Sequence, residues 1–169
     1  EEHFFGGHLK YIKIARPLVQ CPILRKDFIV DPYQIYQARI IGADAILLIA
    51  AALTVDECKR LAAKAHELSL EVLLEIHSEK ELEYLNEHID MIGVNNRNLG
   101  TFHTDVENSF RLAGKLPKET LLVSESGISQ PETIKQLRQA GFRGFLIGET
   151  FMKTAVPGET LRTFIQTLQ

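Results

Sequence analysis

The sequence has few cysteines, no long apolar run and no strong excess of either charge. Its two cysteines, Cys21 and Cys58, lie far apart and form no Cys-x-x-Cys pair, which excludes a disulfide framework and a zinc ribbon. The longest apolar run, 43–53, is interrupted by Asp44 and is too short to cross a bilayer. A formal net charge of -3 gives no general reason to expect nucleic acid or a membrane as a partner. We therefore expect a cytoplasmic protein with reduced thiols.

The composition is that of an ordinary globular protein. Hydrophobic residues make up 45% and charged residues 24%, so disorder is not expected, and 169 residues can form a single domain, 1–169. The chain opens on the acidic Glu1 and Glu2, whereas a signal peptide opens on basic residues. Because the chain also begins without methionine, we expect a truncated piece of a longer protein.

Short apolar runs alternate with longer amphipathic stretches along the chain. Each run is bounded by Gly, Pro, Asp or Asn, which is typical of strands that are covered on both faces. Six strands are predicted, at 22–28, 45–49, 71–76, 91–95, 121–124 and 144–147. Their spacing is that of βαβ units, which indicates a parallel sheet.

Helix-capping patterns mark three of the segments between these strands. Residues 54–68 open with Thr54 and Glu57, a capping box, and place Val55, Cys58, Leu61, Ala62 and Ala65 on one face. The same pattern predicts helices at 78–86, from Ser78 and Glu81, and at 129–140, from Ser129 and Glu132. The second helix carries many acidic residues, which we interpret as a solvated face.

The residues at the strand ends favour a closed (β/α)8-barrel, of the TIM type, over an open sheet. Five of the six predicted strands end in charged, amide or Gly/Ser groups, and barrel enzymes carry their catalytic groups at the carboxyl ends of several strands. An open sheet concentrates its site at one switch point. No Gly-x-Gly-x-x-Gly fingerprint of a dinucleotide site follows a strand. We predict a partial barrel of about six βα units, strands three to eight.

Two charged residues at strand ends are candidates for proton transfer. Lys26 ends an apolar run and can act as a general acid or as a cation for a substrate carboxylate; the alternative is an exposed lysine paired with Asp27. Glu75 ends another run and can act as a general acid or base; the alternative is a structural partner of Lys26 or Arg97. A site needs such pairing, so the two interpretations of Glu75 are compatible.

Amide and glycine residues follow three later strands. Asn95 and Arg97 can hydrogen-bond a polar substrate, although Asn is also a favoured turn residue. Ser126, Gly127 and Gly148 lie in loops after the last two predicted strands, where barrels of this kind bind phosphate. None of the six histidines shows metal-ligand spacing; His77 alone lies close to a strand end.

The segments 22–30, 42–49, 73–77, 92–99, 124–128 and 145–149 resemble indole-3-glycerol-phosphate synthase in order and spacing, over essentially the whole chain. The opening residues resemble the loop after that family's second barrel strand. The resemblance implies ring closure of 1-(2-carboxyphenylamino)-1-deoxyribulose 5-phosphate, with loss of carbon dioxide and water, in tryptophan biosynthesis. It implies no cofactor and no metal, and a phosphorylated small molecule as the partner.

The resemblance also implies roles for individual residues. Lys26 is the expected general acid, Glu75 the acid/base carboxylate and Asn95 the residue that orients substrate hydroxyls. Arg97 and Glu125 are expected to support substrate binding. Three apolar side chains, Phe5, Phe28 and Leu47, are expected to pack against the anthranilate ring. The expected phosphate site consists of Ser126, Gly127, Gly148 and Glu149.

Two departures from the family pattern limit what the chain is expected to do. His8 stands where the family usually has serine, and the first barrel strand, with a further glutamate and lysine, lies outside the sequence. A barrel without two strands exposes sheet edges, so we expect an impaired fragment that can self-associate. The alternatives are an inactive assembly piece of this enzyme, another phosphate-binding barrel such as phosphoribosylanthranilate isomerase or the tryptophan synthase α subunit, and a sugar-phosphate binding protein.

Overall fold

A computed structural model describes residues 6–98, 100, 101 and 103–168, so the predicted substrate contact Phe5 lies outside the described residues. The described chain divides into two compact units. Unit 1 comprises residues 1–76 and 80–91, and unit 2 comprises residues 77–79 and 92–169. Within the described ranges, no helix is both long and apolar enough to cross a bilayer. The expectation of a single domain stays a prediction.

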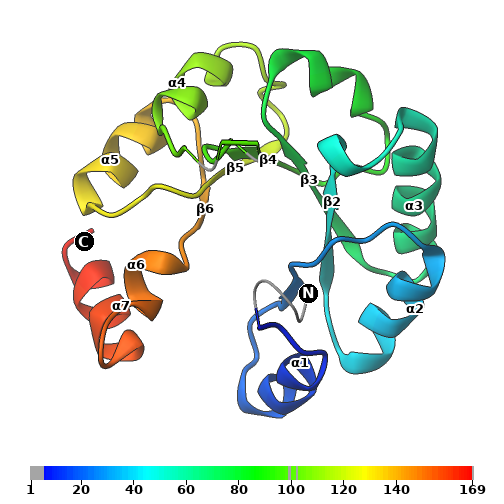
Figure 1. Cartoon of the computed structure of the whole chain (residues 1–169), viewed down its shortest axis with the longest axis horizontal. Helices are drawn as coiled ribbons and strands as arrows, with labels where there is room; N and C mark the ends of the chain where they lie inside the picture. Colours follow the sequence, from blue (N-terminus) through cyan, green and yellow to red (C-terminus); the bar gives the residue numbers. More distant parts are fainter. Residues whose placement is uncertain (1–5, 99, 102, 169) are drawn as a thin grey trace. The chain divides into compact units, whose positions relative to one another are not determined.

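Unit 1 contains three parallel strands in the order β1-β2-β3 (Figure 1). Its elements in chain order are α1 (Lys10–Ala15), η1 (Arg16–Leu18), β1 (Leu24–Arg25), α2 (Pro32–Ile41), β2 (Ala45–Ile49), η2 (Ala50–Ala52), α3 (Val55–Glu67), β3 (Glu71–Ile76) and the 3₁₀ helix η3 (Glu79–Tyr84), which begins at the boundary with unit 2. Leu24 pairs with Ala45, and Ile49 pairs with Glu75. The strands are therefore aligned so that their carboxyl ends lie at one edge of the sheet.

The core of unit 1 follows from the apolar strands and the amphipathic helix α3. All five residues of β2 are buried, and the buried residues of α3 are Cys58, Leu61, Ala62 and Ala65. At the start of α3, the Thr54 hydroxyl accepts the Glu57 N–H, and the Glu57 carboxylate accepts the Thr54 N–H at 2.8 Å. This capping box confirms the predicted helix start. Val55, expected on the buried face, is 37% exposed because it lies in the first turn of the helix.

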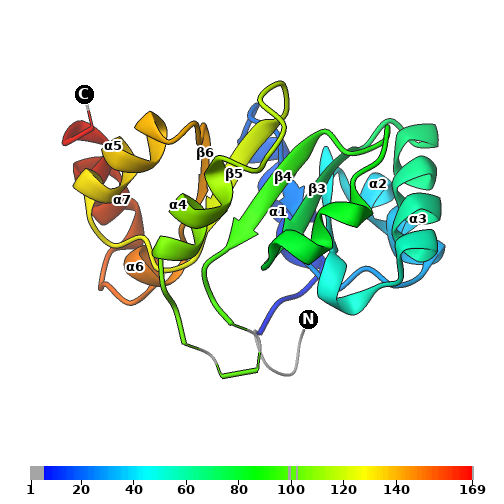
Figure 2. The same cartoon turned by 90° about the horizontal axis from the view of Figure 1, so that it is seen from above.

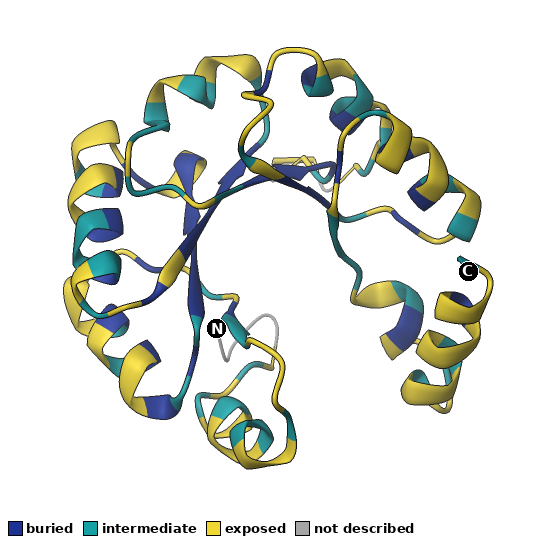
Figure 3. Cartoon of the chain, turned by 180° about the vertical axis from the view of Figure 1, so that it is seen from behind, coloured by how far each residue is buried: buried dark blue, intermediate teal, exposed yellow. Residues whose placement is uncertain are grey.

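Unit 2 contains the strands β4 (Met91–Asn95), whose first residue belongs to unit 1, β5 (Leu121–Glu125) and β6 (Gly144–Leu146). Strand β5 lies between β4 and β6 and pairs in parallel with β6. The helices are α4 (Glu107–Ala113), α5 (Pro131–Gln139), α6 (Glu149–Met152) and α7 (Pro157–Gln166). Figure 2 shows α4 and α5 alongside the strands β5 and β6. In both units the strands are mostly buried, and the helices expose their outer faces (Figure 3).

Five predicted elements need correction. Strand β1 covers only Leu24–Arg25 of the predicted 22–28, β5 extends one residue further than expected, and β6 ends one residue earlier. The predicted helix at 78–86 is a 3₁₀ helix without buried residues. The capping box at Ser129 is wrong: α5 begins at Pro131, so its N-cap is Gln130, which makes no side-chain cap bond.

Candidate active site

Lys26 and Glu75 form an ion pair in unit 1. The Lys26 Nζ atom lies 3.2 Å from Glu75 Oε2, and the side chains are 53% and 2% exposed. A carboxylate is rarely this deeply buried unless it is paired. The predicted pairing of Glu75 with Lys26 is thus confirmed, and the pair places a solvent-accessible ammonium against a buried carboxylate at the strand ends.

Strand alternation explains why Lys26, rather than its neighbours, reaches Glu75. Successive side chains in a strand point to opposite faces. Arg25 is 4% exposed and points toward α2, where its Nη1 donates to the Gln34 carbonyl at 2.5 Å. Its Nη2 lies 3.1 Å from Asp27 Oδ2. Lys26 therefore emerges on the other face, the face of Glu75.

The predicted apolar contacts of unit 1 differ in exposure. Leu47 is 1% exposed in the centre of β2 and pairs in register with Leu73, two residues before Glu75. Leu47 thus shares the Glu75 face of the sheet. Phe28 is 40% exposed beyond the end of β1. Their contact with an aromatic ring of the substrate stays a prediction.

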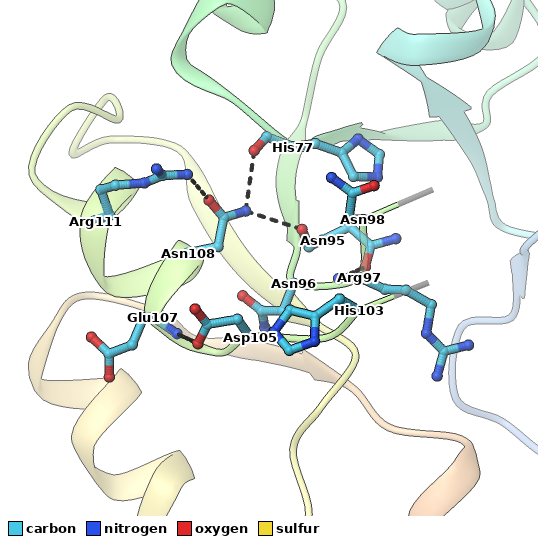
Figure 4. A pocket seen from close by; sticks show the side chains of 10 residues that line it. All are labelled: His77, Asn95, Asn96, Arg97, Asn98, His103, Asp105, Glu107, Asn108 and Arg111. Atoms are coloured by element: carbon cyan, nitrogen blue, oxygen red, sulfur yellow. Dashed lines mark hydrogen bonds between the residues drawn. The ribbon is translucent and has the colours of Figure 1, made fainter. Parts of the chain in front are cut away.

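Unit 2 holds a polar cavity of about 460 Å³ (Figure 4). It is lined by His77, Asn95, Asn96, Arg97, Asn98, His103, Asp105, Glu107, Asn108 and Arg111. Two guanidinium groups, two carboxylates and several amides make it suited to a polar small molecule. Of these residues, Asn95 and Arg97 are the predicted substrate contacts, and His77 is the histidine predicted to lie near a strand end.

Hydrogen bonds fix the walls of this cavity. The Asn108 Nδ2 group donates to the backbone carbonyls of His77 and Asn95, at 3.1 Å each, and Arg111 donates to Asn108 Oδ1 at 2.6 Å (Figure 4). The Asn95 Oδ1 atom accepts the Arg97 N–H at 2.9 Å, so the turn that we considered as the alternative for Asn95 is present. A turn residue can still present its remaining polar atoms to a substrate.

Arg97 connects the cavity wall to the predicted phosphate loops. Its Nη2 atom lies 2.8 Å from Glu149 Oε2 at the start of α6, and the two side chains are 35% and 73% exposed. Thr150, the next residue, donates its hydroxyl to the Ile128 carbonyl at 2.8 Å, which ties α6 to the loop after β5. The structure thus brings Arg97, Glu149 and the Ser126–Gly127 turn into one region of unit 2.

The Ser126–Gly127 turn has a backbone conformation that L-residues rarely adopt. Both residues lie in the left-handed region, with φ of 68° and 74°. A Cβ atom at Gly127 would lie 2.5 Å from Thr104 Cγ2, so glycine is required there for space as well as conformation. Glu125, just before the turn, is 1% exposed. Its predicted role in substrate binding stays a prediction.

Asn96, next to the predicted Asn95, is a buried amide that the sequence did not single out as a site residue. Asn96 is 4% exposed, and its side chain bonds Ser109 and Ser124, which are both fully buried. Its partners lie 13 and 28 residues away in the sequence, so no local pattern signals them. Within the described part of the chain, no cluster of three His, Cys, Asp or Glu side chains suits a metal ion.

Solved structures with similar folds define the class of the protein. A mutant tryptophan synthase alpha-subunit from Pyrococcus furiosus matches with a TM-score of 0.75 and 17% identity, over 96% of this chain and 74% of that one. The KGPDC structure from Streptococcus mutans matches with a TM-score of 0.74 and 13% identity, over 97% and 79%. These likenesses confirm the predicted fold, a partial (β/α)-barrel.

Sequence comparison then identifies the family. The model of the indole-3-glycerol phosphate synthase family matches residues 1–164. An indole-3-glycerol phosphate synthase from Bacteroides thetaiotaomicron is 70% identical over all 169 residues, and one from Polaromonas naphthalenivorans is 49% identical over 162 residues. The chain belongs to the indole-3-glycerol phosphate synthase family. It spans 65% and 62% of the length of these two relatives, respectively.

Proposed function

We propose that this chain carries catalytic and phosphate-binding residues of an enzyme that makes indole-3-glycerol phosphate. The substrate is 1-(2-carboxyphenylamino)-1-deoxyribulose 5-phosphate. An aromatic carbon attacks the ribulose carbonyl, carbon dioxide leaves from that carbon, and loss of water completes the indole ring. We further propose that the reaction takes place in the cytoplasm without cofactor or metal.

The Lys26–Glu75 ion pair carries this proposal. Attack on the carbonyl needs a proton on its oxygen, and the Lys26 ammonium is exposed enough to deliver it. Dehydration then needs a base for the substrate proton and an acid for the departing hydroxide. The Glu75 carboxylate, 3.2 Å from Lys26, can exchange protons with the lysine during these steps.

Unit 2 supplies binding groups in the proposed mechanism. Asn95 and Arg97 line the polar cavity and would hydrogen-bond the substrate hydroxyls and an anionic group. Ser126, Gly127, Gly148 and Glu149 would surround the phosphate, with backbone N–H groups and the Ser126 hydroxyl as donors. A phosphate remote from the reacting carbon provides binding energy for orientation. Family membership favours this activity over those of the other phosphate-binding barrels.

A product assay tests the proposed function directly. The full-length protein that the native gene encodes is mixed with the substrate, and indole-3-glycerol phosphate is detected by its fluorescence. We expect turnover in the wild type and in Lys59→Ala, a control that disrupts a surface pair with Glu87 (3.3 Å; side chains 56% and 63% exposed). We expect a loss of 100-fold or more, about the contribution of one acid–base group, in Lys26→Ala. A wild type without turnover would refute the proposal.

The activity of residues 1–169 on their own is a separate proposal. We propose that they turn over substrate more slowly than the full-length protein, and that exposed strand edges lead them to self-associate. Size-exclusion chromatography and the same product assay test both points. A monomer that works at the full-length rate would contradict them.

A further inference from the structure

A buried amide side chain connects three segments of unit 2. The Asn96 Nδ2 group donates to Ser124 Oγ at 3.1 Å and to the Ser126 carbonyl at 3.0 Å. Its Oδ1 atom accepts the Ser109 N–H at 3.1 Å and the Ser109 hydroxyl at 2.8 Å. An amide has two donor hydrogens and two acceptor lone pairs. All four are used, so the network fixes which way the amide faces.

The contact with the Ser126 carbonyl controls the peptide group between Ser126 and Gly127. A trans peptide is planar, with its C=O and N–H pointing in opposite directions. The cis form is absent among the described residues. The Ser126 carbonyl faces the buried Asn96 amide, so the N–H of Gly127 points away from Asn96, and Gly127 itself is exposed.

The rest of the turn depends on this orientation. Ser126 adopts φ of 68°, which costs an L-residue about 1 kcal/mol, so surrounding contacts must hold it. Its own N–H donates to the Leu146 carbonyl at 3.3 Å on the β6 side. Asn96 therefore holds one end of Ser126, and β6 holds the other.

We propose that Asn96 is a positioning residue, whose amide aims the Gly127 N–H at the phosphate of the substrate. This inference rests on the proposed function, in which the Ser126–Gly127 turn binds that phosphate. Asn96 acts through the turn and does not itself touch the substrate. Without its donor group the peptide can rotate, and one hydrogen bond to a charged phosphate is lost.

The variant Asn96→Asp tests this role because it keeps the shape and replaces the Nδ2 donor by a carboxylate oxygen, which repels the Ser126 carbonyl. In the full-length protein, we expect KM for the substrate and Kd for inorganic phosphate to rise about tenfold, the effect of about one hydrogen bond. We expect kcat to change by less than about threefold, because the phosphate is far from the reacting carbon.

Ser109→Ala is the matched control. It removes both hydroxyl contacts of Ser109, to Asn96 Oδ1 and to Ser124 Oγ (2.7 Å), and leaves the Asn96 bond to Ser126 in place. We expect this control to lose stability but to keep KM and the phosphate Kd within about twofold of wild type. If both variants raise KM in proportion to their loss of stability, Asn96 is only structural and the inference fails.

A second measurement stands even if Asn96→Asp does not fold. Phosphate added to the wild type should slow hydrogen exchange at the Gly127 amide, measured by NMR, more than at the Gly141 amide of a distant turn. Equal slowing, or none, would overturn the inference. If Asn96→Asp turns over substrate with an unchanged phosphate affinity, the inference about Asn96 is overturned and the proposed function stays intact. A wild type without turnover would instead refute the proposed function.

Discussion

Replacing Gly127 by alanine introduces two separate sources of strain at the turn after β5. The residue has φ of +74°, a region that L-residues disfavour, and the added Cβ would lie 2.5 Å from Thr104 Cγ2 and 3.3 Å from Val106 Cγ2. Thr104 cannot easily move its methyl group aside. Its side chain is β-branched and stiff, and its Oγ1 atom accepts a hydrogen bond from Arg97 Nε at 3.4 Å.

The expected loss of unfolding free energy follows from these two sources of strain. The left-handed backbone costs an alanine about 1 kcal/mol. Forcing an extra carbon into an occupied space costs about 1–3 kcal/mol. Together they predict that Gly127→Ala lowers the free energy of unfolding by about 2–4 kcal/mol.

A double-mutant cycle separates the two sources of strain. Thr104→Ser removes the colliding methyl group, so Gly127→Ala with Thr104→Ser should be less destabilised than the sum of the single variants, by about 1–2 kcal/mol. Gly141→Ala is the control for the backbone alone, since its φ is +106° and the nearest atom to its Cβ is 4.0 Å away. Because the protein has no tryptophan, urea unfolding is followed by far-UV circular dichroism. Additive effects of the two substitutions would refute the collision.

Two further predictions concern titratable groups in unit 1. The Ile23 N–H (2.7 Å) holds the pKa of Asp44 below its ordinary value, against partial burial and with help from Arg16 (2.5 Å). The lowered pKa of Asp44 contributes about 1 kcal/mol to the free energy of unfolding, a small value because the carboxylate is half exposed. This contribution is present above the unfolded pKa of Asp44 and is lost as the pH falls through its folded pKa. The stability gap between wild type and Asp44→Asn should therefore shrink in urea unfolding below about pH 4; a constant gap would contradict this. Burial raises the pKa of the Cys58 thiol to about 11, so iodoacetamide should modify the exposed Cys21 in the native protein and reach Cys58 only after unfolding. Equal native rates would contradict this.

The predictable parts of the fold are those that local pattern determines. Strands β2, β3 and β4 begin and end where predicted, because each is a short apolar run bounded by polar or turn residues. The start at Ser129 was wrong because Pro131 takes the first helical position, which makes Gln130 the N-cap. The segment 79–84 forms only a 3₁₀ helix, because none of its residues is buried to anchor a longer helix.

The candidate site was predictable to the extent that its residues lie at strand ends. Lys26, Glu75 and Asn95 are where the strand pattern put them, and the Lys26–Glu75 pairing was one of the predicted alternatives. Asn96 was not predictable, because its role depends on Ser109 and on the turn after β5, both distant in the sequence. Long-range side-chain networks of this kind follow from packing and leave no local signature.

In the proposed mechanism, Lys26 and Glu75 act as one proton-transfer unit. The most direct test measures kcat/KM for indole-3-glycerol phosphate formation in Lys26→Met, Glu75→Gln and the double variant of the full-length protein. Each single variant should lose about 100-fold to 10,000-fold, and the double variant should be little worse than the poorer single, because residues that act as a unit are not additive. Single variants with wild-type activity, or losses that multiply in the double variant, would contradict the claim.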